Sequence, residues 1–205
     1  MPNNETLHKA RTVFERHVPS QAVELCLNLY TQYPFTFIIK KPRLGKLGDY
    51  RHTFSSNRHT ITINNDLGKY SFLITYIHEV AHLITTLKHG RKAEPHGKEW
   101  KHYYGQLILQ SVKTNCFPPD LELELLQFAQ SPKASTAASK NLTLALKKIE
   151  GSPHIITLSE INVGEKFIFK GLEYLKLEKK RTRSLCLNTQ NNNRYLIPEV
   201  VEVKR

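Results

Sequence analysis

The clearest periodic pattern of apolar residues lies between Tyr70 and His89. Apolar side chains recur there at spacings of three and four, which is typical of a helix with one buried face. The apolar positions are Leu73, Ile77, Val80, Ala81, Ile84 and Leu87. Gly90 follows directly and is a common residue at a helix C-terminus. The pattern therefore predicts an amphipathic helix over residues 70–89.

Further helices and a set of short strands are expected around this helix. The other predicted helices cover residues 5–16, 19–32 and about 96–113. Segments with strand-like alternation cover residues 35–40, 49–54 and 60–64. A turn containing Gly45 and Gly48 separates the first two of these strands. Because the segments are short and close in sequence, we expect a small antiparallel sheet.

The character of the sequence changes after residue 130. We therefore expect a first domain over residues 1–130. Residues 131–150 begin with small and polar side chains and predict a linker with a short helix. Residues 151–205 alternate β-branched and aromatic side chains between glycines and asparagines, which predicts a small basic all-β module. The expected fold class is α+β with this module at the C-terminus.

Composition narrows the function classes. Thirty Lys and Arg against 18 Asp and Glu give a net charge of +12, which suits a polyanion such as DNA, although a basic protein without such a partner has the same balance. The three cysteines are far apart and predict reduced thiols. No secretory signal and no apolar run of about 18 residues stand out. We expect a cytoplasmic monomer that does not enter a membrane.

The motif HEVAH at residues 78–82 lies within the predicted helix. Histidines four positions apart share a helix face, so His78 and His82 can direct ring nitrogens at one ion. Glu79 is rotated to the side, where it can reach a water at the metal and act as a base. The motif thus predicts a zinc site with Glu79 as catalytic base, against the alternative of two surface histidines.

A catalytic zinc site needs a third protein ligand. His89 is on the same helix but about 10 Å beyond His82 at the rise of an α-helix, so it cannot share the ion with His78. His96 follows a turn with Gly90 and Pro95 and can fold back. We favour His96, with Glu94, Glu99 and His102 as alternatives.

HEVAHL, a short basic loop and PHGKEWK together resemble the SprT-like zinc metallopeptidases, whose relatives include Spartan, a protease that removes proteins crosslinked to DNA. The resemblance covers about residues 5–130. It implies a zincin-like domain with one catalytic zinc ion, His96 as the third ligand and Trp100 packed beneath the site. Many family members end in a zinc ribbon of paired cysteines. Only Cys186 stands in that region here, so the β module takes the place of the ribbon.

The expected activity is zinc-dependent hydrolysis of peptide bonds, with a protein or peptide as substrate and DNA-associated proteins as one substrate class. Tyr76, Tyr103 and Tyr104 are candidates to stabilise an oxyanion. The strand HTITIN, residues 59–64, is expected to pair with an extended substrate. The alternatives are a DNA-binding protein whose zinc site is structural or proteolytically idle, and a hydrolase of a non-peptide substrate.

Residues 166–183 give the strongest local signal for nucleic acid. Basic residues alternate there with aromatic ones, a pattern that can follow a phosphate backbone and stack bases, although a solvated basic hairpin has the same composition. The candidate contacts are Lys176, Lys179, Lys180, Arg181 and Arg183.

Overall fold

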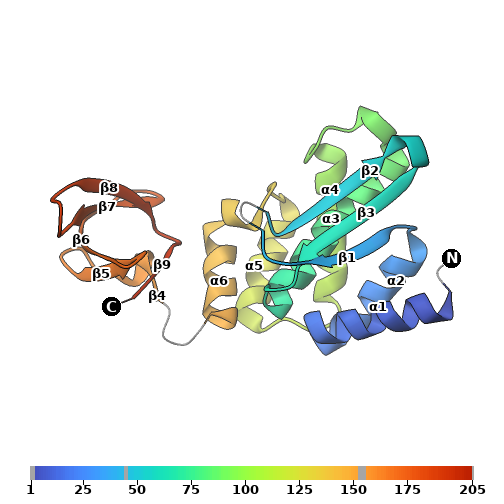
Figure 1. The fold of residues 1–205 in the computed structure, drawn as a ribbon, viewed down its shortest axis with the longest axis horizontal. Helices are drawn as coiled ribbons and strands as arrows, with labels where there is room; N and C mark the ends of the chain where they lie inside the picture. Colours follow the sequence, from blue (N-terminus) through green and yellow to red (C-terminus); the bar gives the residue numbers. More distant parts are fainter. Residues whose placement is uncertain (1–2, 44–45, 152–155, 205) are drawn as a thin grey trace. The chain divides into compact units, whose positions relative to one another are not determined.

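The structure is a computed structural model that describes residues 3–43, 46–151 and 156–204 (Figure 1). The chain divides into two compact units, Met1–Ser135 and Thr136–Arg205. The division lies a few residues beyond the expected domain end at residue 130, and the helix expected in the linker groups with the β module. Among the described helices, none is long and apolar enough to cross a membrane.

The described residues of the first unit form five α-helices and three strands. The helices are α1 (Asn4–His17), α2 (Val23–Gln32), α3 (Lys69–His89), α4 (Lys98–Val112) and α5 (Pro119–Gln130). The strands are β1 (Thr36–Lys40), β2 (Gly48–Thr53) and β3 (Arg58–Asn64). Sequence patterning missed α5, because the proline pair before it indicates a helix end. Pro119 instead occupies the first turn of α5, where its missing N–H has no helical partner to lose.

The three strands form a mixed sheet in the order β1-β3-β2. β2 runs antiparallel to β3, whereas β1 runs parallel to it. The expectation of a purely antiparallel sheet was therefore wrong, because the chain reverses twice between β1 and β3 and the last strand enters between the other two. It follows that the segment HTITIN is the central strand with both edges occupied, so its expected pairing with a substrate is also wrong. Gly45, expected in the turn before β2, lies outside the described residues.

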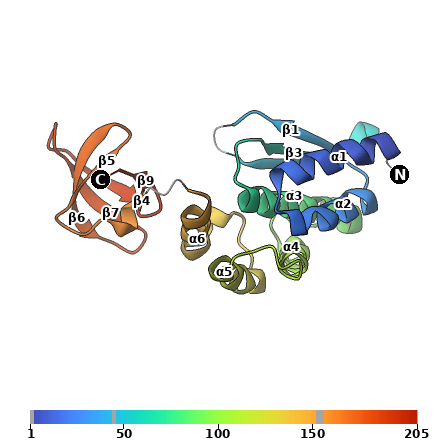
Figure 2. The ribbon, with the colours of Figure 1, turned by 90° about the horizontal axis from the view of Figure 1, so that it is seen from below.

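Helix α3 lies between the sheet and α4 (Figure 2). It is buried on more than the one face that its periodicity indicated, with Phe72, Ile74, Tyr76 and Leu83 inside as well as the predicted stripe. At its C-terminal end Leu87 is 44% exposed and leaves the core. Because α3 is enclosed on several sides, the side chains of its central turns have little freedom to move.

Aromatic contacts attach the N-terminal helices to α3. The ring of Phe14 on α1 lies 5.0 Å from that of Tyr76 on α3 and 5.4 Å from that of Phe37 on β1. The Tyr76 hydroxyl donates to the carbonyl of Cys26 on α2 at 3.0 Å. These contacts fix the turn of α3 that immediately precedes the HEVAH motif.

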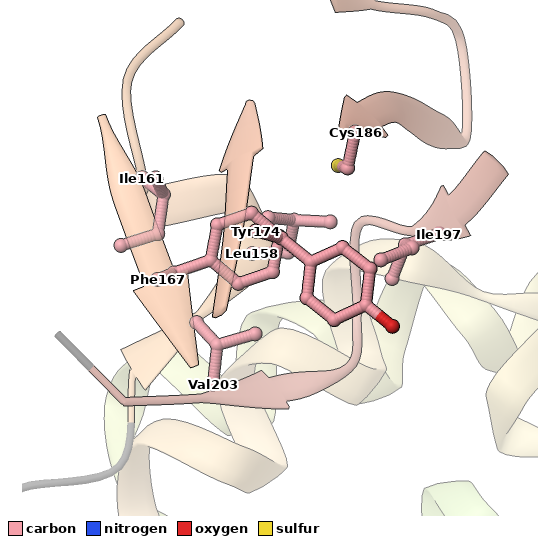
Figure 3. Packing of buried hydrophobic residues seen from close by; sticks show 7 residues of the cluster. All are labelled: Leu158, Ile161, Phe167, Tyr174, Cys186, Ile197 and Val203. Atoms are coloured by element: carbon pink, nitrogen blue, oxygen red, sulfur yellow. The ribbon is translucent and has the colours of Figure 1, made fainter. Parts of the chain in front are cut away.

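The part of the second unit that the structure describes contains one α-helix and six strands. The elements are α6 (Lys140–Glu150), β4 (Ile156–Thr157), β5 (Lys166–Phe169), β6 (Leu172–Lys179), β7 (Arg183–Asn188), β8 (Arg194–Pro198) and β9 (Glu202–Val203). β5 to β8 form an antiparallel sheet in chain order, and β4 pairs with β9. Figure 3 shows its apolar core, in which the rings of Phe167 and Tyr174 stack 5.7 Å apart. The all-β character expected for this region is confirmed.

This module also buries an ion pair. Lys176 Nζ lies 3.0 Å from Glu199 Oε1, and the two side chains are 1% and 0% exposed. The ammonium also donates to the carbonyls of Leu158 at 2.7 Å and Ile161 at 2.9 Å. The prediction that Lys176 contacts nucleic acid was therefore wrong. Strand alternation directs this side chain into the module, where it is saturated by internal acceptors.

Candidate metal centre

The ring nitrogens of three histidines converge at the centre of the first unit. His82 Nε2 lies 3.2 Å from His78 Nε2 and 3.1 Å from His96 Nε2. In a tetrahedral site, nitrogens about 2.0–2.1 Å from a zinc ion are about 3.3 Å from one another. All three ligand atoms lie within 4.8 Å of one another, so these residues fit a shared metal ion. The predicted convergence of His78, His82 and His96 is confirmed.

His96 reaches the other two histidines through a tight turn after α3. The Gly97 N–H donates to the Glu94 carbonyl at 2.9 Å, and Pro95 precedes His96. His96 has φ of 59°, so with proline before it the turn is of type II. Glycine or asparagine normally occupies this position, because an L side chain there is strained. The turn thus holds a histidine at an energetic cost, as is common at functional sites.

Aromatic rings form the base of the site. The ring centroid of Trp100 lies 4.8, 5.2 and 4.6 Å from those of His78, His82 and His96. Tyr104, one turn further along α4, lies 5.2 Å from His78. Both aromatic side chains are buried. The expected packing of Trp100 beneath the histidines is confirmed, and this packing orients the imidazoles.

Burial keeps the histidines neutral. Desolvation, followed by the charges of the neighbouring histidines, lowers the pKa of His78 to about 3. The same causes lower the pKa of His82 to about 4, and desolvation lowers that of His96. A neutral imidazole has a free lone pair, so near neutral pH the three side chains are in the protonation state that a metal ion requires.

Glu79 lies beside this cluster and is only 6% exposed. Desolvation, followed by the charge of Asp49, raises its pKa to about 8, although the Tyr50 backbone N–H and the cations Arg43 and Lys46 act in the opposite direction. All these neighbours come from β2 and the segment before it. β2 therefore determines the electrostatic surroundings of the carboxylate on α3.

The other candidate ligands have different partners. His89 Nε2 lies 3.0 Å from the Tyr103 hydroxyl, and the His102 ring lies 5.2 Å from that of Tyr103. Neither belongs to the three-histidine cluster, nor do Glu94 and Glu99. His96 is thus the residue that completes the cluster.

The tyrosines differ in their access to the site. The Tyr76 hydroxyl donates to the carbonyl of Cys26, and the Tyr103 hydroxyl is hydrogen-bonded to His89, so neither hydroxyl reaches the cluster. Tyr104 contacts His78, and the nearby Glu79 adds to the burial that raises its pKa. Sequence reasoning missed Tyr50, whose ring is parallel to that of His82 within 4° at 6.3 Å. A strand tyrosine two positions after a glycine gives no signal of this proximity.

The remaining basic candidates are exposed at one end of the C-terminal sheet. Lys179, Lys180, Arg181 and Arg183 surround the turn between β6 and β7. Lys180 pairs with Glu178 at 3.3 Å. This end of the module, residues 179–183, is called the basic hairpin end below.

The match to a known family covers the part of the chain that builds the metal centre. Residues 26–118 match the family model described as the SprT-like family. No curated protein and no solved structure gave a match. The matched region runs from α2 to just beyond α4 and includes the sheet, the HEVAH helix and the turn with His96. Residues 26–118 of this chain therefore belong to the SprT-like family.

Proposed function

We propose that this chain is a zinc-dependent endopeptidase with a zincin-like catalytic domain. The observation that carries the proposal is the convergence of three neutral imidazoles beside the buried carboxylate of Glu79, which is not part of the candidate ligand set. A purely structural metal site has no need for that additional carboxylate.

When bound, a zinc ion supplies Lewis acidity that polarises a carbonyl and lowers the pKa of a water. His78, His82 and His96 would hold the ion, and the buried rings of Trp100 and Tyr104 pack against these histidines. Glu79 accepts a proton from the attacking water and returns it to the leaving nitrogen. Burial raises the pKa of this carboxyl, and the charge of a bound ion would lower it again toward the range that suits both steps.

The substrate class is a protein or peptide in extended conformation. Strand β2 pairs with β3 on one side, and among the described residues no strand pairs with its other side. Its residue Tyr50 lies alongside both Glu79 and His82. An extended peptide that pairs with β2 would pass the metal centre, so β2 replaces the central strand as the proposed docking edge.

The proposal is tested by replacing Glu79 with glutamine in the zinc-loaded protein. We expect Glu79→Gln to retain one zinc ion per chain and to lose cleavage of casein or histones by at least about 100-fold, because an amide cannot accept the proton. Glu15→Gln, on the exposed side of α1, is the matched control and should cleave normally. Undiminished cleavage by Glu79→Gln would remove Glu79 from the reaction.

We propose DNA-associated proteins as the substrates, with DNA held by the basic hairpin end. Arg181 and Arg183 are exposed there and have no acidic partner among the described residues. Arg181→Ala/Arg183→Ala should weaken binding to duplex DNA and flatten its dependence on salt. Lys166→Ala, whose amine already pairs with Glu173 at 3.0 Å, is the control. A salt-independent affinity in the wild type contradicts a phosphate contact.

The cleavage assay and the DNA-binding assay together distinguish the proposed peptidase from the remaining alternative. A DNA-binding protein with an idle zinc site would bind DNA through the basic hairpin end and bind zinc, yet wild type and Glu79→Gln would show equal, negligible cleavage. The buried, proton-accepting position of Glu79 favours the peptidase.

A further inference from the structure

Gly48, the first residue of β2, is in direct contact with Glu79. A Cβ atom placed on Gly48 would lie 2.6 Å from Glu79 Oε1 and 2.9 Å from Glu79 Cγ. It would also lie 2.7 Å from Thr75 Cγ2, one turn earlier on α3. All three distances are shorter than van der Waals contact. The backbone of Gly48 is in an ordinary strand conformation without positive φ, so the requirement for glycine is the close approach alone.

The backbone around Gly48 has little room to withdraw. Gly48 is in register with Ile63 of the central strand. The carbonyls of the two preceding residues accept from Asn64: Leu47 from its N–H at 2.9 Å, and Lys46 from its side-chain amide at 2.9 Å. Arg43 Nε in turn donates to the Asn64 side-chain oxygen at 2.7 Å. These hydrogen bonds therefore fasten the start of β2 to the end of β3.

Helix α3, on the other side of this contact, is equally constrained. Thr75 and Glu79 belong to α3, whose neighbouring side chains Tyr76, Ile77 and Val80 are fully buried. Helix and strand thus leave no room at Gly48 for a side chain larger than hydrogen unless a neighbouring group shifts. If a Cβ were added at Gly48, the group that could move aside is the Glu79 carboxylate, because it lies at the end of a side chain with rotatable bonds.

We propose that Gly48 is a positioning residue whose missing side chain creates the slot in which the Glu79 carboxylate is held beside the three histidines. The consequence for turnover rests on the proposed peptidase function. The contact between Gly48 and Glu79 does not. A methyl group at position 48 should displace the carboxylate while leaving the three imidazoles in place, because the three atoms nearest to the added Cβ belong to Glu79 and Thr75.

The contact is tested by a double-mutant cycle on the thermal unfolding of the metal-free full chain. Gly48→Ala should lower Tm through the clash. Glu79→Asp shortens the opposing side chain by one methylene, so the double variant should recover part of the lost Tm. Gly105→Ala is the matched control, since its Cβ would meet the Ala129 carbonyl at 2.7 Å, a clash that a shorter Glu79 cannot relieve. Additive effects of Gly48→Ala and Glu79→Asp would overturn the proposal.

A second pair of variants covers the case in which Gly48→Ala fails to fold. Thr75→Ser removes the methyl group that lies in the way and keeps the hydroxyl that donates to the Ser71 carbonyl at 2.7 Å. Gly48→Ala/Thr75→Ser should fold with the added Cβ opposed by Glu79 alone. The cycle with Glu79→Asp is then run in the Thr75→Ser background, where additive effects would again overturn the proposal.

The catalytic consequence is measured on the zinc-loaded variants. Gly48→Ala should keep one zinc ion per chain, reduce kcat by about tenfold to 100-fold and change KM little, because a misplaced catalytic group affects the reaction more than binding. An unchanged kcat would overturn the positioning role. If the wild type cleaves no protein but the stability cycle shows coupling, the peptidase proposal fails and the Gly48–Glu79 contact stands.

Discussion

The Nε2 atoms of His82 and His96 lie 3.1 Å apart although the residues are 14 positions apart in the chain. His82 lies on a buried helix, whereas His96 lies on a type II turn with a strained backbone. Two of the proposed ligands are therefore fixed by the helix, and the position of the third depends on the conformation of one turn. Metal affinity should be sensitive to that turn.

Replacement of His96 tests this division of roles. We expect His96→Ala to purify with less than about a tenth of the zinc bound by the wild type, because two imidazoles alone do not complete a catalytic zinc site. His89→Ala is the control, since His89 lies on α3 together with His78 and His82 but contacts Tyr103. Metal content measured by mass spectrometry on the two proteins decides the matter. Equal zinc in both would exclude His96 as a ligand.

The strain at His96 predicts a difference in stability between His96→Gly and His96→Ala, which both lack the imidazole. Glycine adopts φ near 59° without steric penalty, whereas alanine does not. Metal-free His96→Gly should therefore be more stable than His96→Ala by about 1 kcal/mol, the order of the left-handed penalty. Urea unfolding monitored by circular dichroism measures the difference. A less stable glycine variant would show that the turn relaxes without cost.

The histidine cluster was predictable because its constraints are local. The periodicity of one helix is enough to place His78 and His82 on the same face. The return of His96 toward them follows from a chain reversal marked by Gly90 and Pro95. The role of these histidines as zinc ligands stays a prediction until metal is measured. The α3 helix was also predictable, although its burial was underestimated, since one sequence does not show how many neighbours surround a helix.

Other features depend on contacts between distant segments. The parallel pairing of β1 with β3 is decided by which strand enters the centre of the sheet, and alternation does not encode this order. The lysine at position 176 reads as a surface cation until Glu199, far along the chain, is seen opposite it. Gly48 was interpreted as part of a turn, and its proximity to Glu79 was missed, although an isolated strand glycine is a recognised sign of close approach.

The buried histidines predict acid instability of the metal-free protein. The pKa values of His78 and His82 are about 3 and about 4 in the folded state, against 6.5 as the ordinary value. Between these values the unfolded chain binds more protons than the folded one, so stability falls as pH is lowered from about 6.5. Unfolding at pH 7 and pH 5 measures the loss. His78→Gln/His82→Gln should show a flatter profile, and an equal slope in both proteins would contradict the assignment.

Glu79 should contribute a pH dependence of opposite sign. Its pKa is raised to about 8 from an ordinary value of 4.5, so the folded state binds more protons in that window and stability falls as pH rises through it. Glu79→Gln removes the titration and keeps the shape of the neutral acid. The metal-free variant should therefore be more stable than the wild type at pH 9 and nearly equal to it at pH 4.5. A constant difference at both pH values would indicate a packing effect.

The buried pair in the C-terminal module predicts a large asymmetry between single and double substitutions. Lys176→Met leaves the Glu199 charge buried without its 3.0 Å partner and frees two carbonyls, so we expect a loss of about 3–5 kcal/mol. Lys179 Nζ, 3.9 Å from Glu199 Oε2, would compensate that charge only in part. Adding Glu199→Gln removes the charge and should restore part of that stability, with the Ser184 hydroxyl still able to donate to the amide oxygen.

Hydrogen exchange across residues 156–204 of the full chain reports on this unit separately from the first. Lys166→Met is the control, because its surface partner Glu173 is 43% exposed and such a pair contributes less than about 1 kcal/mol. We expect fast exchange in Lys176→Met, intermediate exchange in the double variant and wild-type exchange in the control. Equal protection in all four proteins would mean that apolar packing around Phe167 and Tyr174 alone holds the module together, and that the buried lysine is dispensable.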